Sequence, residues 1–172
     1  MRFTQKITLI AFTGLLAFFT RAQTTSDVFQ IIGESQNHTT LFEAIKSADL
    51  IETLKSKGPF TVFAPTNQAF AQLPAGDLEA LKHPENKKEL AKFINYHVIA
   101  GKYDENALLA AIKKGRGKVK LRTVAGGKLK FRLVKGYIII TDGKGGKSTI
   151  SKSNIDATNG TVHIVESVLI RK

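Results

Sequence analysis

The spacing of apolar residues changes once along this chain, from a helical period in the first half to alternation in the second. Between residues 28 and 54, apolar side chains recur every three or four positions, which predicts two helices with possible caps at residues 24–27 and 39–40. Residues 47–49 are expected to interrupt the second helix. Further short helices are predicted after the capping residues Thr66 or Asn67 and Asn86, from Asp77, and from Asp104 or Glu105.

From residue 118 onwards, apolar and polar residues alternate, as in a strand with one buried face. A helical first half followed by antiparallel strands is an α+β pattern. Because no repeat or linker interrupts residues 23–172, these residues are predicted to form a single domain. Glycine-containing turns divide the second half into predicted strands at residues 118–123, 128–133, 137–141, 149–154 and 162–170, and a short strand is expected earlier at residues 98–99.

Residues 58–70 carry the clearest local signals in the chain. Residues 60–64 alternate as in a strand with at least one buried face. Pro65 removes a backbone donor and is expected to end this strand. Thr66 or Asn67 can then accept hydrogen bonds from the first N–H groups of a helix. The stretch therefore predicts a turn, a buried strand, a stop and a capped helix.

The first 22 residues have the pattern of a secretory signal peptide. Arg2 and Lys6 precede a 13-residue apolar run, and small residues at positions 20 and 22 suit cleavage after Ala22. The alternative, a membrane anchor, is disfavoured because a spanning helix needs about 20 apolar residues. Cysteine is absent, which excludes disulfides and thiolate metal sites. We therefore expect a secreted protein, extracellular or periplasmic, with no transmembrane anchor.

Three segments together resemble the signature motifs of the fasciclin-type domain, an extracellular adhesion module. They are residues 58–70, residues 96–101 with their Tyr–His pair, and residues 154–169, and they occur in the order and spacing of the family. The resemblance covers about residues 25–169. It implies a β-rich α+β fold of the fasciclin type: a compact seven-stranded antiparallel β wedge or sandwich, with flanking helices mostly from the N-terminal half.

The same resemblance implies a function. Members of the family are matrix proteins, surface proteins and small, single-domain secreted bacterial proteins. Reported partners are integrins, other matrix proteins and glycans, and the domain is not known as an enzyme. In vertebrate relatives the dipeptide that matches Tyr96–His97 is linked to integrin binding. However, His97 lies on the apolar face of its predicted helix, and such a histidine is more often buried with its ring nitrogens bonded to backbone groups. We therefore interpret Tyr96 and His97 as structural.

Basic residues are concentrated in one part of the chain. Residues 113–152 contain thirteen lysines and arginines and a single acidic residue, Asp142. Without the three basic residues of the signal segment, the formal net charge falls from +12 to +9. In the predicted strands at residues 118–123 and 128–132, the cations occupy alternate positions. If these strands pair across the turn at residues 126–127, six cations share one face: Lys118, Lys120, Arg122, Lys128, Lys130 and Arg132.

Two interpretations of this basic face are open. A solvated outer face keeps a sheet soluble and blocks aggregation at its edge, although such faces usually mix charge signs, and like charges at opposite positions repel. The other interpretation is binding of a polyanion, through an acidic polysaccharide, a sulfated glycan or an anionic cell surface. Proteins are further possible partners. Nucleic acid is disfavoured because export is expected and no aromatic residues are interleaved among the cations for base stacking.

Signals for catalysis, metals or cofactors are sparse. The sequence has no cysteine nucleophile, no G-x-S-x-G elbow and no H-E-x-x-H pair, and we expect no metal and no cofactor. Residues 143–149 resemble a phosphate loop, but Thr141 replaces its first glycine, so a hairpin tip is predicted. His163 alternates with apolar residues in the last strand, which predicts exposure or cross-strand pairing. Of the glycosylation sequons at Asn37 and Asn159, the second is interpreted as an Asn–Gly turn.

These patterns predict a secreted, non-enzymatic fasciclin-type module that uses its basic sheet face to hold an anionic glycan or cell surface. The alternative is a hydrolase or a small-ligand binder on the same scaffold, which requires a concave pocket with convergent polar groups. A pocket around Tyr96, His97 or His163 would favour this alternative, whereas a filled core at these residues would disfavour it.

Overall fold

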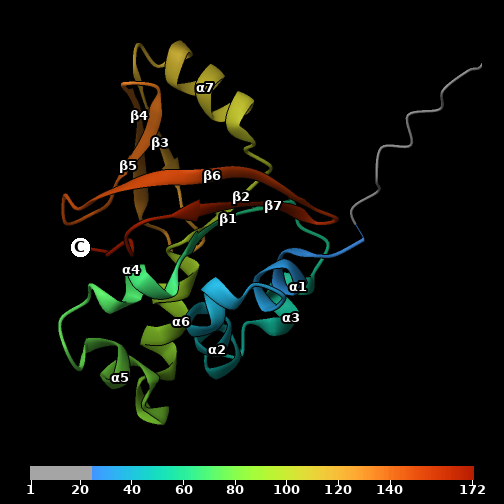
Figure 1. Cartoon of the computed structure of the whole chain (residues 1–172), viewed down its shortest axis with the longest axis vertical. Helices are drawn as coiled ribbons and strands as arrows, with labels where there is room; N and C mark the ends of the chain where they lie inside the picture. Colours follow the sequence, from blue (N-terminus) through green and yellow to red (C-terminus); the bar gives the residue numbers. More distant parts are fainter. Residues whose placement is uncertain (1–24) are drawn as a thin grey trace, which may run out of the picture.

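The computed structural model describes residues 25–172, which form one seven-stranded sheet with α-helices and two short 3-10 helices (Figure 1). The predicted signal peptide lies outside these residues, and none of the described helices has the length and hydropathy of a membrane span. The helices are α1 (Val28–Gly33), η1 (Gln36–His38), α2 (Thr39–Ser47), α3 (Ile51–Lys55), α4 (Asn67–Ala71), α5 (Asp77–Lys82), η2 (Pro84–Asn86), α6 (Lys87–Asn95) and α7 (Glu105–Lys114). The strands are β1 (Phe60–Pro65), β2 (Val98–Ala100), β3 (Lys118–Arg122), β4 (Lys128–Val134), β5 (Tyr137–Thr141), β6 (Lys147–Ala157) and β7 (Gly160–Val165).

The seven strands lie in the order β2-β1-β7-β6-β5-β4-β3. Neighbouring strands are antiparallel except β1 and β7, which run parallel, from Phe60 opposite Gly160 to Pro65 opposite Val165. The prediction of an antiparallel wedge is therefore wrong at this pair, and the sheet is mixed. Alternation shows which residues share a face, but it does not encode the direction of the neighbouring strand.

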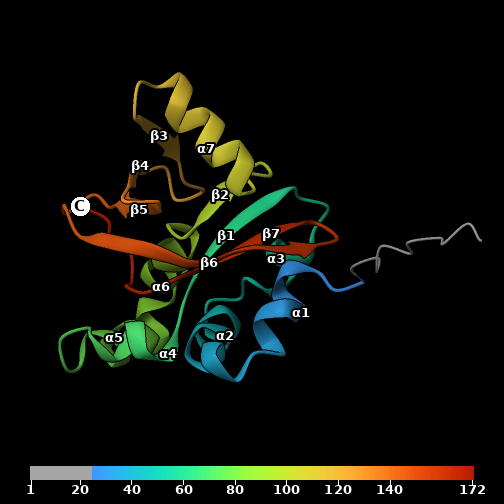
Figure 2. The same cartoon turned by 45° about the horizontal axis from the view of Figure 1, so that its top comes forward.

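The sheet curls until its two edges approach each other. Just beyond β3, the backbone N–H of Val124 donates to the carbonyl of Val98 in β2, at 2.8 Å. The long strand β6 makes this curvature possible, because its first part pairs with β5 and its remainder pairs with β7 through two irregularities in register. Such irregularities bend a strand and increase its twist. Figure 2 shows β6 running from the β5 side of the sheet to the β7 side.

Two hydrophobic cores lie on opposite faces of β1 and β7. The helical layer covers one face, where Val62 and Val162 join the first core. The other face closes on the inside of the curled sheet, where the ring centroid of Phe63 lies 5.3 Å from that of Phe131. Helix α7 covers this second core with its buried Leu108. Because both faces are covered, nearly every residue of β1 and β7 is buried.

Three of the predicted helix caps are confirmed. The side chains of Asp27, Thr66 and Asp104 accept hydrogen bonds from backbone N–H groups in the first turns of α1, α4 and α7. Asn86 precedes α6 as expected, but its side chain donates to the carbonyl of Ala80 and caps nothing. The cap predicted at Asn86 is therefore wrong, because a nearby free carbonyl competes for the amide.

The ends of several elements also differ from the predictions. The expected interruption separates α2 from α3, with Asp49 in the left-handed region at φ 55°. The last strand ends at Val165, not at residue 170, and β6 extends beyond the predicted residues 149–154. The glycine-rich segment is the turn between β5 and β6, as predicted. Its Asp142 carboxylate accepts from three backbone N–H groups, two within the turn and one at Ile170, which holds the C-terminal segment against the turn.

Candidate functional site

The three motif segments meet at the parallel pair β1–β7. Gly58 has φ 51°, and a Cβ added there would lie 2.2 Å from the carbonyl oxygen of Asn159. A Cβ added at Gly160 would lie 2.1 Å from the carbonyl oxygen of Phe60. Real Cβ atoms do not approach backbone oxygens so closely, so both positions require glycine. The first and third motif segments therefore lock together through their glycines.

The side chain of Asn159 fixes this junction to the helical layer. It is 9% exposed, and its Oδ1 accepts from the N–H of Val28 at 3.0 Å. Its Nδ2 donates to the carbonyls of Leu54 and Ser56 at 2.7 and 2.9 Å. The predicted turn before β7 is confirmed, and the buried, fully bonded amide explains this asparagine without glycosylation.

His97 links the central motif to the other two. It is 1% exposed, its Nδ1 lies 3.0 Å from the carbonyl of Phe93, and its Nε2 lies 2.9 Å from the backbone nitrogen of Leu169. Because the Leu169 N–H can only donate, Nε2 accepts and Nδ1 carries the proton. Its carbonyl accepts from the N–H of Phe63 at 2.9 Å. Burial lowers the pKa of His97 to about 4, so the ring is neutral at neutral pH. These contacts support the structural interpretation of His97.

Tyr96 packs its ring against the turn between β3 and β4. It is 1% exposed, and a Cβ on Gly127 would lie 2.5 Å from its ring. Its hydroxyl donates to the carbonyl of Lys128 at 3.3 Å, and burial raises the pKa of the phenol. Tyr96 therefore braces the hairpin that carries the predicted basic face.

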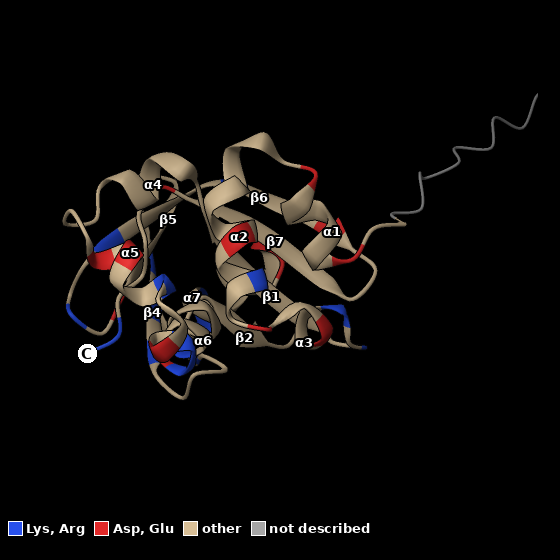
Figure 3. Cartoon of the chain, turned by 90° about the horizontal axis from the view of Figure 1, so that it is seen from below, with Lys and Arg blue, Asp and Glu red and all other residues tan. Residues whose placement is uncertain are grey.

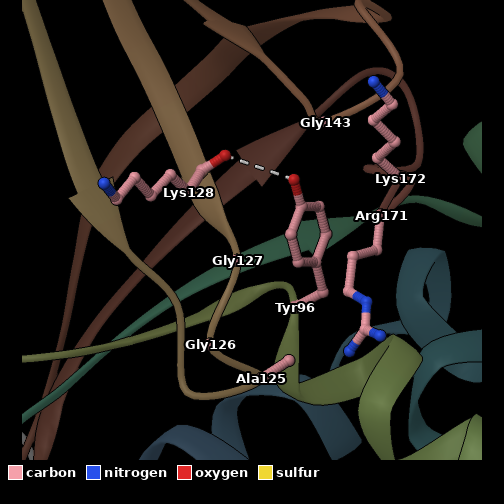
Figure 4. A pocket seen from close by; sticks show the side chains of 8 residues that line it. All are labelled: Tyr96, Ala125, Gly126, Gly127, Lys128, Gly143, Arg171 and Lys172. Atoms are coloured by element: carbon pink, nitrogen blue, oxygen red, sulfur yellow. Dashed lines mark hydrogen bonds between the residues drawn. The ribbon is translucent and has the colours of Figure 1, made fainter.

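An open pocket of about 370 Å³ lies beside Tyr96 (Figure 4). Residues 125–128, Gly143, Arg171 and Lys172 complete its lining, and the Lys128 side chain points away from it. The titratable side chains that line this pocket are the phenol of Tyr96 and the cations of Lys128, Arg171 and Lys172. A pocket of the kind required by the small-ligand alternative is present here, whereas His97 and His163 lie in filled core.

His163 is buried, so its predicted exposure is wrong and only the predicted cross-strand pairing holds. Its exposed fraction is 0%, its ring stacks on Phe63 of β1 at 5.5 Å, and its Nε2 lies 2.8 Å from the carbonyl of Tyr103. Burial lowers the pKa of this histidine. The alternation of residues failed to predict exposure because β7 is covered on both faces. A polar residue in this strand is therefore not a sign of contact with solvent.

The third buried histidine, His38, lies at the start of α2. Its Nδ1 is 2.8 Å from the hydroxyl of Ser35, and burial lowers its pKa. It lines a pocket of about 280 Å³, in which isoleucine and valine from α1, β6 and β7 make up half of the lining residues. No cluster of three or more histidine, aspartate or glutamate side chains able to hold a metal occurs within residues 25–172.

The predicted basic face is present on the hairpin of β3 and β4, and we call its six residues the cationic face. The strands pair so that like charges stand directly opposite each other: Lys118 with Arg132, Lys120 with Lys130, and Arg122 with Lys128. The residues between them point inward, and Leu129 and Phe131 belong to the second core. Opposite residues on one face of such a pair lie about 5 Å apart at Cβ, which is close enough for repulsion.

No acidic side chain neutralises the cationic face within the described residues, because the ion pairs found there involve other lysines. Five of the six cations are exposed and Lys130 is half-buried. Arg122 also donates from Nε to the carbonyl of Gly126 at 3.2 Å. The cations therefore remain available to a ligand.

The structure adds one residue that the sequence interpretation missed. Thr141 lies opposite Lys130, and Lys147 lies opposite Thr141, so the row that begins at Lys120 continues across four strands. Lys147 is exposed. The alternation of residues does not show the register between β5 and β6. The sequence therefore offered only one sign that Lys147 joins this row, namely a lysine beside a glycine-rich turn.

This architecture is a mixed seven-stranded sheet of the α+β class, with helices packed on one face of its parallel pair. The family model of the fasciclin domain matches residues 36–171, which contain all three motif segments and the cationic face. The chain belongs to the fasciclin domain family.

Relatives and a solved structure agree with this assignment. Over 143 residues the chain is 38% identical to protein sll1483 of Synechocystis sp., covering 83% of this chain and 72% of that protein. It is 35% identical to transforming growth factor-beta-induced protein ig-h3 of Sus scrofa over 83% of this chain but only 19% of that longer protein. A FAS1 domain pair from the insect cell adhesion molecule fasciclin I has the same fold, with a TM-score of 0.66 at 17% identity, covering 86% of this chain and 51% of that chain.

Proposed function

We propose that this chain is a secreted, non-enzymatic adhesion module whose cationic face binds an anionic polysaccharide of a cell surface or matrix. One observation carries this function: six cations stand in three directly opposed pairs, and no acidic side chain within residues 25–172 forms an ion pair with them. Adhesion is also the role of the insect protein that contains the matched domain pair.

Electrostatic repulsion among the six cations is the physical argument for a ligand. Like charges opposite each other destabilise a strand pair, and a face that served only solubility would usually mix both signs. Alternate residues along one strand lie about 7 Å apart, so the two strands present cations in a regular grid. A flexible chain with repeated sulfate or carboxylate groups can place an anion between neighbouring cations, which relieves their repulsion.

Heparin affinity chromatography tests this function. Wild-type protein is expected to elute above physiological salt, and Lys118→Gln/Lys120→Gln/Lys130→Gln is expected to elute well below it. The matched control is Lys55→Gln/Lys57→Gln/Lys88→Gln, which removes three exposed lysines from the helical side and the same net charge. Its elution should stay close to that of the wild type. Elution of the wild-type protein below physiological salt, or equal losses in both variants, would contradict a dedicated binding face.

A glycan array at two salt concentrations then identifies the class of polysaccharide. Binding to sulfated or uronic-acid glycans should weaken at the higher salt, because exposed charges are screened within about 10 Å at 0.1 M. Neutral glycans should give no signal at either concentration. Binding that is insensitive to salt would contradict recognition through the cationic face.

A further inference from the structure

A second exposed surface lies where β4 turns into β5. Leu133, Val134 and Tyr137 are 49%, 46% and 62% exposed, and we call these three residues the apolar tip. Among the large hydrophobic residues that the structure describes, only Val124 is comparably exposed, and it lies at the other end of the β3–β4 hairpin. A cluster of exposed apolar side chains on an otherwise charged surface usually marks an interaction site.

The apolar tip is held by a tight and regular turn. Lys135 and Gly136 have φ values of 49° and 86°, as in the two-residue turns that suit a hairpin. Directly beside this turn, Val134 pairs with Tyr137 on the face that carries Arg132, and Leu133 pairs with Ile138 on the opposite face, so the apolar tip has an apolar side chain on both faces of the hairpin. The hairpin therefore presents its apolar side chains on ordered strands, so that little conformational freedom is lost on binding.

Basic residues are numerous in the segments next to the apolar tip. The last turn of α7 and the segment that leads into β3 lie at the same end of the molecule as the β4–β5 turn, at the top of Figure 1. These two segments carry Lys113, Lys114, Arg116 and Lys118, while Arg132 pairs with Lys118 two residues before Val134, and Lys135 lies in the β4–β5 turn itself. The carboxylate near the tip is that of Glu105, which lines a 210 Å³ pocket with Gly136 and Tyr137 and accepts from the hydroxyl of Ser153 at 2.6 Å.

We propose that the apolar tip docks onto an anionic lipid surface. Its three apolar side chains would enter the boundary between headgroups and acyl chains, where tyrosine is favoured, while the nearby cations contact lipid phosphates. A dissolved polysaccharide offers anions but no apolar layer. An anionic bilayer offers both, with phosphates at its surface for the cations and an apolar interior for the apolar tip. Lipid docking rests on the proposed function only in that Lys118 and Arg132 must be free to meet anions.

A fluorescent reporter tests this contact directly, because the chain contains no tryptophan. A Tyr137→Trp variant is mixed with vesicles of equal parts phosphatidylglycerol and phosphatidylcholine, and with vesicles of phosphatidylcholine alone. We expect a blue shift of the emission, and quenching by brominated acyl chains, with the anionic vesicles only. A Val124→Trp variant is the matched control at the opposite end of the hairpin and should show neither. Equal responses of the two reporters, or no response at Tyr137→Trp, would overturn lipid docking.

Vesicle sedimentation separates lipid docking from polysaccharide binding. Leu133→Thr/Val134→Thr/Tyr137→Thr places β-branched residues, which suit strands, at all three positions and should lower affinity for the anionic vesicles about tenfold or more, with unchanged elution from heparin. Unchanged vesicle affinity in this variant would overturn lipid docking and leave the proposed function standing. Vesicle binding by the wild type without retention on heparin would overturn the proposed polysaccharide binding and leave lipid docking standing. Loss of a lipid-free dimer in the same variant would identify the tip as a contact between copies of the chain, and would also overturn lipid docking.

Discussion

The central strands β1 and β7 and the hairpin of β3 and β4 are built on similar alternating patterns but lie in opposite environments. In the central pair both faces are covered, so even polar side chains bond inside: the hydroxyl of Thr61 donates to the carbonyl of Gly101 at 2.7 Å and accepts from the N–H of Tyr103 at 2.8 Å. In the hairpin only the inner face is covered, and the outer face carries the cationic face. The difference teaches that most side chains of the motif strands β1 and β7 serve internal packing and hydrogen bonds, whereas the cationic face lies outside the three motif segments.

Charge separates the same two sides of the molecule. The helical layer carries both signs, as Figure 3 shows from below, and several of its lysines pair with a nearby carboxylate, for example Lys92 with Glu89 at 2.6 Å. On the cationic face one sign stands alone. Ion pairs of this kind on a helix surface contribute only a few tenths of a kcal/mol each to stability. The mixed charges of the helical layer are therefore better explained by solubility than by stabilisation of the fold. The cationic face lacks this mixing of signs, and its like charges stand directly opposite each other.

The largest expected effect on stability comes from removing a large buried side chain from the strand pair β1–β7. Phe63 is 0% exposed, so Phe63→Ala should lower the free energy of unfolding by about 3–5 kcal/mol in urea denaturation. Leu133→Ala, at a position 49% exposed, should cost well under about 1 kcal/mol. The folded fraction of Phe63→Ala should still be retained on heparin. Normal stability with lost heparin retention would show that the first motif segment, residues 58–70, contacts the partner.

The second largest effect on stability is expected at acid pH, through the three buried histidines. Burial lowers the pKa of His97 from its ordinary 6.5 to about 4 and lowers the pKa of His38 and of His163 in the same direction. The unfolded chain therefore binds more protons than the folded one below pH 6.5, so stability is complete above pH 6.5 and is lost as the pH falls towards 4. For His97 this loss is at most about 3 kcal/mol.

Urea denaturation at several pH values measures this effect. His97→Gln should be less stable at neutral pH and should lose less stability between pH 6.5 and 4 than the wild type does. His83→Gln, at an exposed position, is the control and should follow the wild-type profile. A wild-type stability that is flat over this range would show that the three buried histidines accept protons in the folded state.

The smallest effect is expected on the hairpin, and there stability and binding should change in opposite directions. Lys120→Glu places an acid opposite Lys130 and replaces a repulsive pair by an attractive one. The melting temperature, followed by circular dichroism, should rise by roughly 1–3 °C while the protein elutes from heparin at lower salt. Added sodium chloride should stabilise the wild type more than this variant. A lower melting temperature would mean that the six cations do not repel one another in the free protein.

The sequence predicted local structure where a residue acts through its immediate neighbours. Asp27, Thr66 and Asp104 cap helices because a side-chain oxygen reaches an N–H group a few residues ahead, and this requires no knowledge of the fold. The same reasoning failed at Asn86, where a carbonyl six residues earlier in the chain takes the amide. It also failed at His163, because exposure depends on what packs against both faces of β7.

The sequence by itself therefore determined the element types, the three motif segments and the alternation that places six cations on one side of two strands. Only the tertiary structure decided that β1 and β7 run parallel, that both of their faces are covered, and that Lys147 extends the cationic row. It also decided that Leu133, Val134 and Tyr137 are exposed at the β4–β5 turn, close in register to Lys118 and Arg132. The physical reason is range: caps and alternation act over a few residues, whereas strand direction, register and burial are set by contacts between segments up to 131 residues apart.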